Sequence, residues 1–312
     1  MGTDTGGSGR IPAALCGIVG FRPTVGNGFN TGDIKCRRYN DTITDVIPIS
    51  KTRDKIAPMG RTVADVALLD AVITDSPLFL ESKSLRGLRM GIPPWFWTEL
   101  EVDLQLVVDK AKNKLIEAGV DMVDVDIDGL MDLNGRVSLP IALHEPNECL
   151  ATYIVNSPSP EIKLRNVLDQ VASPDVKEIC ESIITDVYAG AYDDAINIYR
   201  PAMQALYERY FSSNNLDAIL FPTTRVSAPF IDALKGSSTL VNGKSVFLEL
   251  IRNTDPGSNA GIPGLSIPAG LTVNGLPVGL AIDGPFGSDR TLLSIGMSME
   301  AVLGLLPPPA MV

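Results

Sequence analysis

The sequence GTDTGGSGRIPAALCGIVGFRPT occupies residues 2–24 and is the pattern from which the rest of the chain is interpreted. Gly6 and Gly7 have no Cβ atom, so the backbone around them can adopt positive φ and bring several N–H groups close to one point. Residues 10–16 predict a short helix, whose positive N-terminal end adjoins the same loop. We therefore expect Ser8 at the loop apex, beside the N–H groups of Thr5, Gly6, Gly7 and Ser8 itself.

A serine in this position fits two interpretations. Toward an amide, serine is a nucleophile only when a base removes its proton and fixed donors stabilise the oxyanion, and this loop offers the donors. The second interpretation is structural, because residues 6–9 (GGSG) are also typical of a flexible loop or of a helix N-cap with Ser8 as the capping residue. Taken alone, these four residues favour the structural interpretation.

Outside this loop, strand and helix patterns alternate along the chain. Helical spacing of apolar residues predicts helices over residues 10–16, 61–74, 102–118 and 288–303, and residues 140–212 are helix-rich and punctuated by prolines, among them Pro146. Apolar or alternating runs predict strands over residues 17–21, 88–92, 120–127, 216–221, 265–269 and 278–282. This alternation favours an α/β sheet with helices on both faces. The polar, glycine-rich residues 25–47 are expected to form an exposed loop.

Composition and charge exclude several classes of protein. The chain has 312 residues, 45% of them hydrophobic, and a formal charge of -11, so it can bury a large core but offers no basic footprint for nucleic acid. The most apolar tract, residues 262–282, is broken by prolines and glycines, so no membrane span is expected. The cysteines are scattered, and Cys16 lies in an apolar run that favours a buried thiol. We expect reduced cysteines and a cytoplasmic location.

Metal ligands are sparse. His144 is the single histidine, so we expect neither a metal site nor a cofactor. A run of aspartates lacks the glycine turn and closing glutamate of a calcium loop and is expected on the solvated face and end of a strand; it comprises Asp121, Asp124, Asp126 and Asp128. Trp95 and Trp97 either line a substrate entrance or pack in the interior, and the sequence does not rank these options.

Residues 2–14, followed by Gly17, residues 20–24 and Gly26, closely resemble the nucleophile segment of the amidase signature family. The resemblance runs along the chain, through residues 61–65 (RTVAD), 221–224 (FPTT) and 264–284 with its LPVGL at 276–280. Residues 253–258 (NTDPGS) and 284–290 (GPFGSDR) are similar to the mandelamide and indoleacetamide hydrolase branch of that family.

The resemblance implies an α/β/α sandwich of the amidase signature type around a mixed β-sheet. It implies a single amidase domain over residues 1–312, with a helix-rich insertion at about 140–212. In the family the serine of this motif is the acyl-accepting nucleophile of a Ser, cis-Ser, Lys triad, so that role carries to Ser8. The oxyanion-hole amides carry to Thr5, Gly6, Gly7 and Ser8. Asp4 is expected to brace the loop by accepting backbone N–H bonds, and Arg10 to pair within the core of the site.

One part of the family pattern is not in this sequence. The triad lysine and the cis-serine lie upstream of the motif in the family, whereas Met1 directly precedes Gly2 here. We therefore expect an N-terminally truncated chain and a fold incomplete at its N-terminus. Other bases in the chain are weak substitutes: His144 is expected to be an ordinary helix-end histidine, and solvation is expected for Lys35, Lys51 and Lys55.

The function implied is hydrolysis of a small linear carboxamide, of aryl- or alkyl-acetamide type, to an acid and ammonia through an acyl-enzyme. The expected partner is the small amide alone, without nucleic acid or membrane, and a homodimer is one option for the oligomeric state. A catalytically inactive fragment or partner-binding remnant is the alternative that the absent lysine and cis-serine favour. A tRNA-dependent amidotransferase subunit is a further alternative, which the acidic charge and the sequence of residues 253–258 disfavour.

Overall fold

The computed structural model describes residues 1–25, 46–172, 174–230, 240–241 and 244–308. The loop expected over residues 25–47 lies almost entirely outside this part of the chain. So do Gly26, Lys35 and Cys36.

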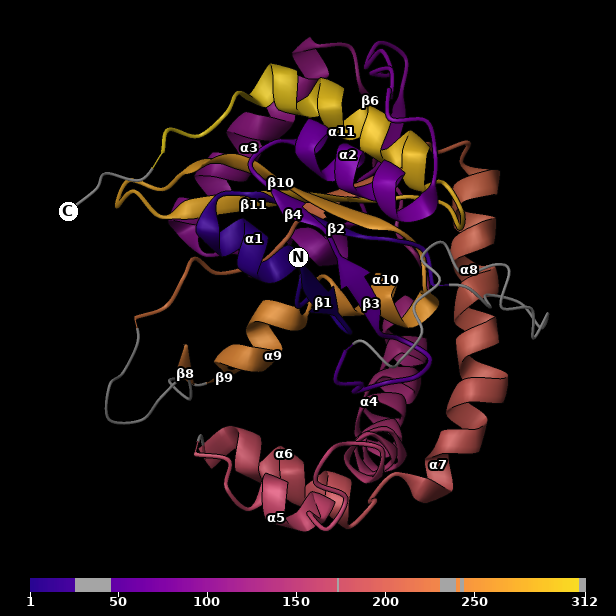
Figure 1. Ribbon diagram of the computed structural model, residues 1–312. Helices are drawn as coiled ribbons and strands as arrows, with labels where there is room; N and C mark the ends of the chain where they lie inside the picture. The colour runs from indigo at the N-terminus through magenta and orange to yellow at the C-terminus, as the bar shows by residue number, and fades with distance from the viewer. Residues whose placement is uncertain (26–45, 173, 231–239, 242–243, 309–312) are drawn as a thin grey trace.

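A mixed sheet forms the centre of the molecule (Figure 1). Seven strands of the described residues lie in the order β4-β2-β10-β11-β7-β5-β6; β5 pairs in parallel with β6 and β7, and the other neighbours are antiparallel. Their bounds are β2 (Val19–Arg22), β4 (Met59–Gly60), β5 (Arg89–Gly91), β6 (Asp121–Val123), β7 (Ala218–Pro222), β10 (Gly264–Leu271) and β11 (Pro277–Asp283). The predicted mixed sheet is confirmed, although β6 is shorter than the alternation over residues 120–127 suggested.

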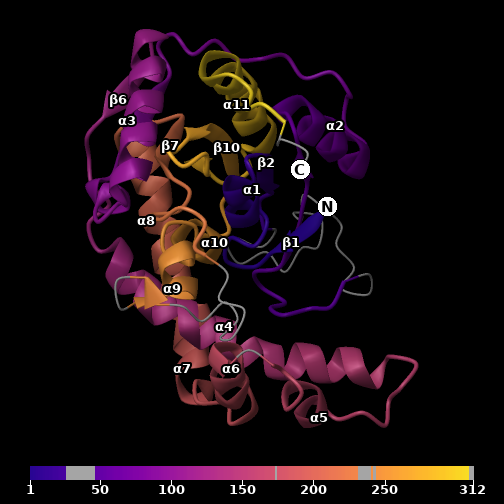
Figure 2. The same ribbon diagram turned by 90° about the vertical axis from the view of Figure 1, so that its left-hand side faces the viewer.

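Helices cover both faces of this sheet (Figures 1 and 2). One face carries α2 (Val63–Thr74), α3 (Val102–Glu117) and α11 (Asp289–Leu303), whose apolar residues share one buried cluster with the strands. Thr62 and Asp65 form a capping box at the start of α2. The opposite face carries α1 (Arg10–Cys16), α4 (Leu130–Val155), α8 (Arg200–Ser213) and α10 (Asp255–Ala260). The predicted α/β/α architecture is therefore confirmed.

The helix-rich segment expected over residues 140–212 begins earlier, with α4. It continues through α5 (Leu164–Leu168), α6 (Pro174–Ile184), α7 (Ala189–Asp194), a π-helical turn η4 (Ala195–Tyr199) and α8. Pro140 and Pro146 lie inside α4, so the expectation that Pro146 interrupts the helix was wrong. Both prolines are buried, and packing of α4 against α6, α7 and α8 outweighs the lost N–H bond of each proline. Among the described residues, no helix is both long and apolar enough to cross a membrane.

Short elements that the sequence did not predict surround the N-terminus. Strand β1 (Gly2–Asp4) pairs antiparallel with β3 (Lys55–Ala57), and the partners in register are Gly2 with Ala57 and Asp4 with Lys55. Further along the chain are the 3₁₀ helix η3 (Pro94–Trp97), the antiparallel pair of β8 (Leu240–Val241) and β9 (Lys244–Ser245), and α9 (Val246–Ile251). The β1–β3 pair fixes the start of the chain next to α1 (Figure 1).

Helix α1 packs unusually close to the sheet. A Cβ atom added to Gly20 on β2 would lie 2.7 Å from the Cβ of Ala13, and one added to Gly279 on β11 would lie 2.4 Å from the Cβ of Ala14. The small residues on both sides let the two backbones approach. Because this face of α1 is the buried one, Cys16 is exposed, and the expectation of a buried thiol was wrong.

Candidate active site

The loop that joins β1 to α1 spans residues 5–9 and carries Ser8. Ser8 is exposed, whereas Gly6, Gly7 and Gly9 are buried. No hydrogen bond links the Ser8 side chain to another described residue. Ser8 does not cap α1, because the N-cap position is Gly9 and no side chain caps it. The N-cap interpretation of the serine is therefore wrong.

Two glycines of the loop are required by their surroundings. Gly7 has a φ of 142°, a backbone conformation that residues with a side chain rarely adopt. A Cβ atom on Gly7 would lie 2.2 Å from Oγ1 of Thr254 and 2.6 Å from Cδ1 of Ile11, and one on Gly6 would lie 2.7 Å from Cδ1 of Ile251. Other parts of the chain thus pack directly onto the loop backbone and leave no room for a side chain.

Three successive carbonyl groups of the loop accept hydrogen bonds. The donors are Nε of Arg53 to Thr5 (3.3 Å), Oγ1 of Thr254 to Gly6 (2.8 Å) and the N–H of Ile11 to Gly7 (2.7 Å). By contrast, within the part of the chain that the structure describes, the N–H groups of Gly6, Gly7 and Ser8 donate to no acceptor. The loop is therefore anchored through its carbonyl oxygens, and its N–H groups remain available to a ligand.

Asp4 is the centre of a buried ionic network beneath the loop. Its Oδ2 accepts hydrogen bonds from the backbone N–H groups of Gly9 (3.2 Å) and Arg10 (3.4 Å), and from Nε of Arg10 (3.0 Å). Its Oδ1 accepts from Nη1 of Arg22 (3.0 Å), and all three charged side chains are fully buried. Burial by itself raises the pKa of the Asp4 carboxyl, but the charges of Arg10 and Arg22 outweigh it and hold that pKa well below its ordinary range.

A second carboxylate lies on the other side of Arg10. Oδ1 of Asp283, at the end of β11, is 3.7 Å from Nη1 of Arg10. Burial raises the pKa of Asp283 to about 7, and the charges of Arg10 and Arg22 offset only part of that effect. Arg10 also donates to the hydroxyl of Ser258 (2.6 Å) and thereby ties the loop to α10.

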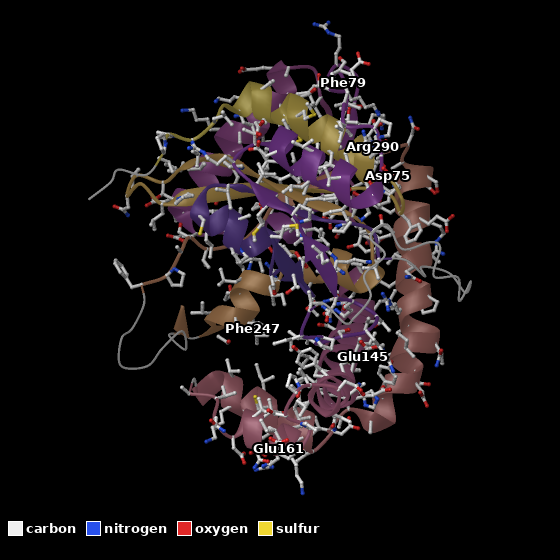
Figure 3. All side chains as sticks on the ribbon, in the orientation of Figure 1. Asp75, Phe79, Glu145, Glu161, Phe247 and Arg290 are labelled. Atoms are coloured by element: carbon white, nitrogen blue, oxygen red, sulfur yellow. The ribbon has the colours of Figure 1, made fainter. Side chains whose placement is uncertain are left out.

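Arg53 connects the loop to two helices. Its Nη2 is 2.6 Å from Oδ1 of Asp255 on α10, and its Nη1 donates to the carbonyl of Ser138 on α4 (3.3 Å). The preceding residues are held by the buried Glu145 of α4 (Figure 3), which accepts hydrogen bonds from the Ser50 hydroxyl and from the N–H of Thr52 (3.2 Å). The segment that places Arg53 is therefore fixed by side chains far away in the sequence.

Sequence reasoning did not single out most of this network. The residues it missed as individual site residues are Arg22, Arg53, Thr254, Asp255 and Asp283. A signal was present, because Arg22 lies in residues 20–24 and Thr254 and Asp255 in residues 253–258, both of which carry the family resemblance. Asp283 ends an apolar strand, and a charged residue in such a position is rarely buried without a partner.

Two of the bases considered as substitutes, Lys51 and His144, make contacts elsewhere in the described residues. Lys51 donates to Glu148 (2.6 Å), a bond that raises the pKa of the lysine, and its side chain is partly exposed. Lys55 is buried in β3, contrary to the expectation that it is solvated. His144 lies inside α4 rather than at a helix end, and its Nδ1 is 2.8 Å from Oδ1 of Asp186. No contact among the described residues joins any of the three to Ser8.

Two other groups of residues are placed by the structure. Asp121, Asp124, Asp126 and Asp128 are all exposed, and no group of potential metal ligands occurs among the described residues. Trp97 donates through Nε1 to the carbonyl of Leu220 (3.1 Å), and the guanidinium of Arg252 lies 3.8 Å from the ring centroid of Trp95. Both tryptophans therefore make packing contacts.

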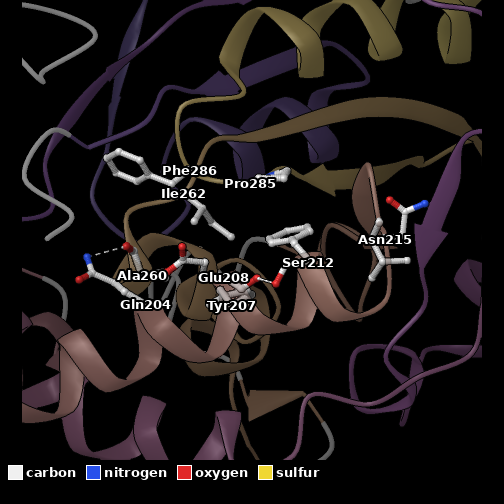
Figure 4. A pocket seen from close by; sticks show the side chains of 11 residues that line it. Gln204, Tyr207, Glu208, Ser212, Asn215, Ala260, Ile262, Pro285 and Phe286 are labelled. Atoms are coloured by element: carbon white, nitrogen blue, oxygen red, sulfur yellow. Dashed lines mark hydrogen bonds between the residues drawn. The ribbon is translucent and has the colours of Figure 1, made fainter.

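A cavity of about 530 Å³ opens between α8 and the segment that follows β11 (Figure 4). Tyr207 and Phe211 of α8 line one side, and Pro285 and Phe286 line another. None of residues 5–8 belongs to its lining. We therefore place the candidate active site at the loop and not at this cavity.

Comparison with known proteins gives a consistent picture. Residues 1–293 match the family model described as Amidase. The chain is 42% identical over 308 residues to an indoleacetamide hydrolase of Agrobacterium vitis, covering 97% of this chain and 62% of that protein. It is 37% identical over 321 residues to a mandelamide hydrolase of Pseudomonas putida, covering 99% and 59%. The chain thus spans about three fifths of the length of these relatives.

A solved structure agrees with the sequence relatives. The crystal structure of an amidase superimposes with a TM-score of 0.73 at 26% identity, over 97% of this chain and 62% of that one. The alignment covers nearly the whole chain, so the two proteins share the α/β/α architecture.

Proposed function

Because this chain belongs to the amidase family, we propose that it hydrolyses the carboxamide bond of a small linear amide through an acyl-enzyme formed on Ser8. The observation that carries this proposal is the anchored loop. Ser8 is exposed at its apex, and three successive N–H groups beside it donate to no described acceptor. Fixed donors of this kind stabilise the negative charge that develops on a carbonyl oxygen under attack.

The proposed reaction has two halves. The Ser8 oxygen bonds to the carbonyl carbon, and the N–H groups of Thr5, Gly6, Gly7 and Ser8 are proposed to stabilise the resulting oxyanion. The C–N bond then breaks, and ammonia leaves with the proton taken from serine. Water attacks the ester that remains, which releases the carboxylic acid and restores the serine hydroxyl.

Asp4 and Arg10 support the loop in this proposal and do not touch the substrate. The carboxylate of Asp4 accepts N–H bonds from the first residues after Ser8, and Arg10 joins the same carboxylate to α10. We propose that the base for Ser8 is the lysine and cis-serine pair of the family pattern. The contacts that His144 and Lys51 make elsewhere support this choice over either of them as the base.

The substrate class rests on the relatives. Their names point to amides of an arylacetic or mandelic acid, so we propose an aryl- or alkyl-acetamide as the substrate. A second candidate is a folded chain without catalysis, because no described lysine or histidine is hydrogen bonded to Ser8.

Ammonia release from indoleacetamide and mandelamide tests the proposal. With the lysine and cis-serine pair present in the protein, we expect release by the wild type, loss of release in Ser8→Ala, and unchanged release in Ser84→Ala, an exposed serine whose hydroxyl accepts a bond from the N–H of Arg86. A Ser8→Ala protein that hydrolyses both amides at the wild-type rate would rule out the proposed site. A folded wild type that releases no ammonia would favour the catalytically inactive candidate.

A further inference from the structure

The peptide group between Gly6 and Gly7 needs an external anchor. Neither residue has a Cβ atom, so this peptide plane can rotate with less steric resistance than any peptide between two larger residues. The sequence contains no other Gly-Gly pair. If the loop is to hold an N–H group in a fixed direction, rotation of the Gly6–Gly7 peptide plane is therefore the motion that must be prevented.

The hydroxyl of Thr254 supplies that anchor. Its Oγ1 donates to the carbonyl of Gly6 at 2.8 Å, whereas the carbonyl of Ile251, the other acceptor within reach of the same proton, is at 3.2 Å. Thr254 is fully buried at the start of α10. Its own carbonyl accepts a bond from Nη2 of Arg10 (3.3 Å), so the anchor is joined to the Asp4 network.

The direction of the Gly7 N–H follows from this bond. In a planar trans peptide the C=O and N–H groups point in opposite directions, and no cis peptide occurs among the described residues. Since the Gly6 carbonyl points at Thr254, the Gly7 N–H points away from it. The same reasoning turns the Gly6 N–H away from Arg53 and the Ser8 N–H away from the N–H of Ile11.

We propose that Thr254 is a positioning residue, whose hydroxyl fixes the Gly6–Gly7 peptide so that the Gly7 N–H faces the carbonyl oxygen of the substrate. This inference rests on the proposed function, in which that N–H stabilises the oxyanion. Thr254 itself does not touch the substrate. It also packs where a Gly7 side chain would be, so the glycine and the threonine constrain each other.

A single nuclear magnetic resonance signal reports on this peptide directly. In protein labelled with ¹³C at glycine carbonyls and ¹⁵N at glycine nitrogens, only Gly6–Gly7 contains a bonded ¹³C–¹⁵N pair, because it is the one Gly-Gly pair of the sequence. We expect Thr254→Val, which keeps the shape and removes the hydroxyl, to move the carbonyl signal upfield. Thr254→Ser keeps the hydroxyl and should retain the wild-type position.

Thr74→Val is the matched control. The Thr74 hydroxyl donates to the carbonyl of Asp70 (2.7 Å) within α2, on the opposite face of the sheet, so its loss removes a comparable bond away from the loop. The Gly6–Gly7 signal should not move in this variant. A signal that stays in place in Thr254→Val would overturn the inference, whether or not the protein is active.

Kinetics on the same variants test the consequence for the reaction. Loss of one oxyanion donor in other enzymes lowers kcat by roughly 100-fold or more, so a misdirected donor should lower kcat by about 10-fold to 100-fold with KM nearly unchanged. Thr254→Ser should restore most of the rate. A moved signal with an unchanged kcat would overturn the positioning role. If the wild type hydrolyses no amide, the proposed function fails, while the carbonyl signal still decides whether Thr254 holds the peptide.

Discussion

Asp4 shows how much of the candidate site depends on one side chain. A single carboxylate accepts two backbone N–H bonds of the loop and pairs with two fully buried arginines, Arg10 and Arg22. Removing the charge would leave two guanidinium groups in the interior with only neutral acceptors and the more distant Asp283. This change is destabilising because a buried charge has lost its hydration, and without a counter-charge no ion pair compensates for that loss.

We predict that Asp4→Asn lowers the free energy of unfolding by about 3–5 kcal/mol, the range for breaking a buried ion pair. The matched control is Glu148→Gln, which removes the partner of Lys51 at the surface, where the Glu148 side chain is 68% exposed. That change should cost at most about 1 kcal/mol. Denaturant unfolding at pH 7 measures both, and equal costs in the two variants would contradict the network described here.

Asp283 gives the molecule a pH dependence opposite to that of Asp4. Its pKa is about 7 in the folded protein and about 3.9 in an unfolded chain, so the folded state holds the proton more tightly between these values. The contribution of Asp283 to the free energy of unfolding is therefore fully present below about pH 4 and decreases as the pH rises toward 7. The contribution of Asp4, whose folded pKa is lowered, is complete above about pH 4 and is lost in more acidic solution.

For Asp283 we predict that the free energy of unfolding changes with pH at a different slope in the wild type and in Asp283→Asn. Between pH 5 and 7 the free energy of unfolding of the wild type should fall relative to that of Asp283→Asn by up to about 1.4 kcal/mol per pH unit. Denaturant unfolding of both proteins across this range provides the measurement. Parallel curves would show that Asp283 titrates normally in the folded state.

The residue-level part of the site was predictable where it is local in sequence. Asp4, Ser8 and Arg10 lie within seven residues, and the resemblance of residues 2–14 and 20–24 to the nucleophile segment of the family implies a role for each. Thr254 and Arg53 contact the same loop from 248 and 48 residues away. Such contacts are created by the packing of α10 and of the segment before β3, so no local pattern near Ser8 indicates them.

At the level of elements, the long periodic segments were predictable and the short ones were not. Helices α1, α2, α3 and α11 lie within two residues of the expected bounds, because each has an apolar face at helical spacing. Strands β1 and β3 have three residues each and pair across 50 intervening residues. Their existence depends on that pairing, and the three-residue patterns GTD and KIA carry no alternation strong enough to predict it.

The close contact between α1 and the sheet predicts that alanine destabilises the protein at Gly279, whereas alanine at Gly135, which is far from that contact, stabilises it. Gly279→Ala should destabilise the protein by about 1–3 kcal/mol, because the added methyl group would overlap Ala14 and push α1 away from the sheet. Gly135→Ala, at an exposed position inside α4 where no atom beyond the adjacent helix backbone lies within 4 Å of the new Cβ, should stabilise it by up to about 1 kcal/mol. Thermal unfolding of the two variants and the wild type measures both changes in stability. A stabilising Gly279→Ala would contradict the close packing of α1.

For the whole molecule, the fold was predictable because strand and helix patterns alternate and because the family resemblance extends along the chain. The single-domain organisation remains a prediction. The proposed reaction needs the architecture as a whole, since the loop is held at once by the β1–β3 pair, by α1 on the sheet and by α10. Strand β1 and helix α1 flank the loop in sequence, whereas β3 and α10 come from distant parts of the chain.

The most direct test of the central claim is to locate the adduct formed with a serine-directed fluorophosphonate by mass spectrometry of the digested protein. In a protein that carries the lysine and cis-serine pair, the anchored loop and the exposure of Ser8 predict one modified peptide, the one that contains Ser8. They also predict no modification at that position or elsewhere in Ser8→Ala. Equal labelling of Ser8→Ala, or an adduct on a different serine of the wild type, would contradict the assignment of Ser8 as the nucleophile.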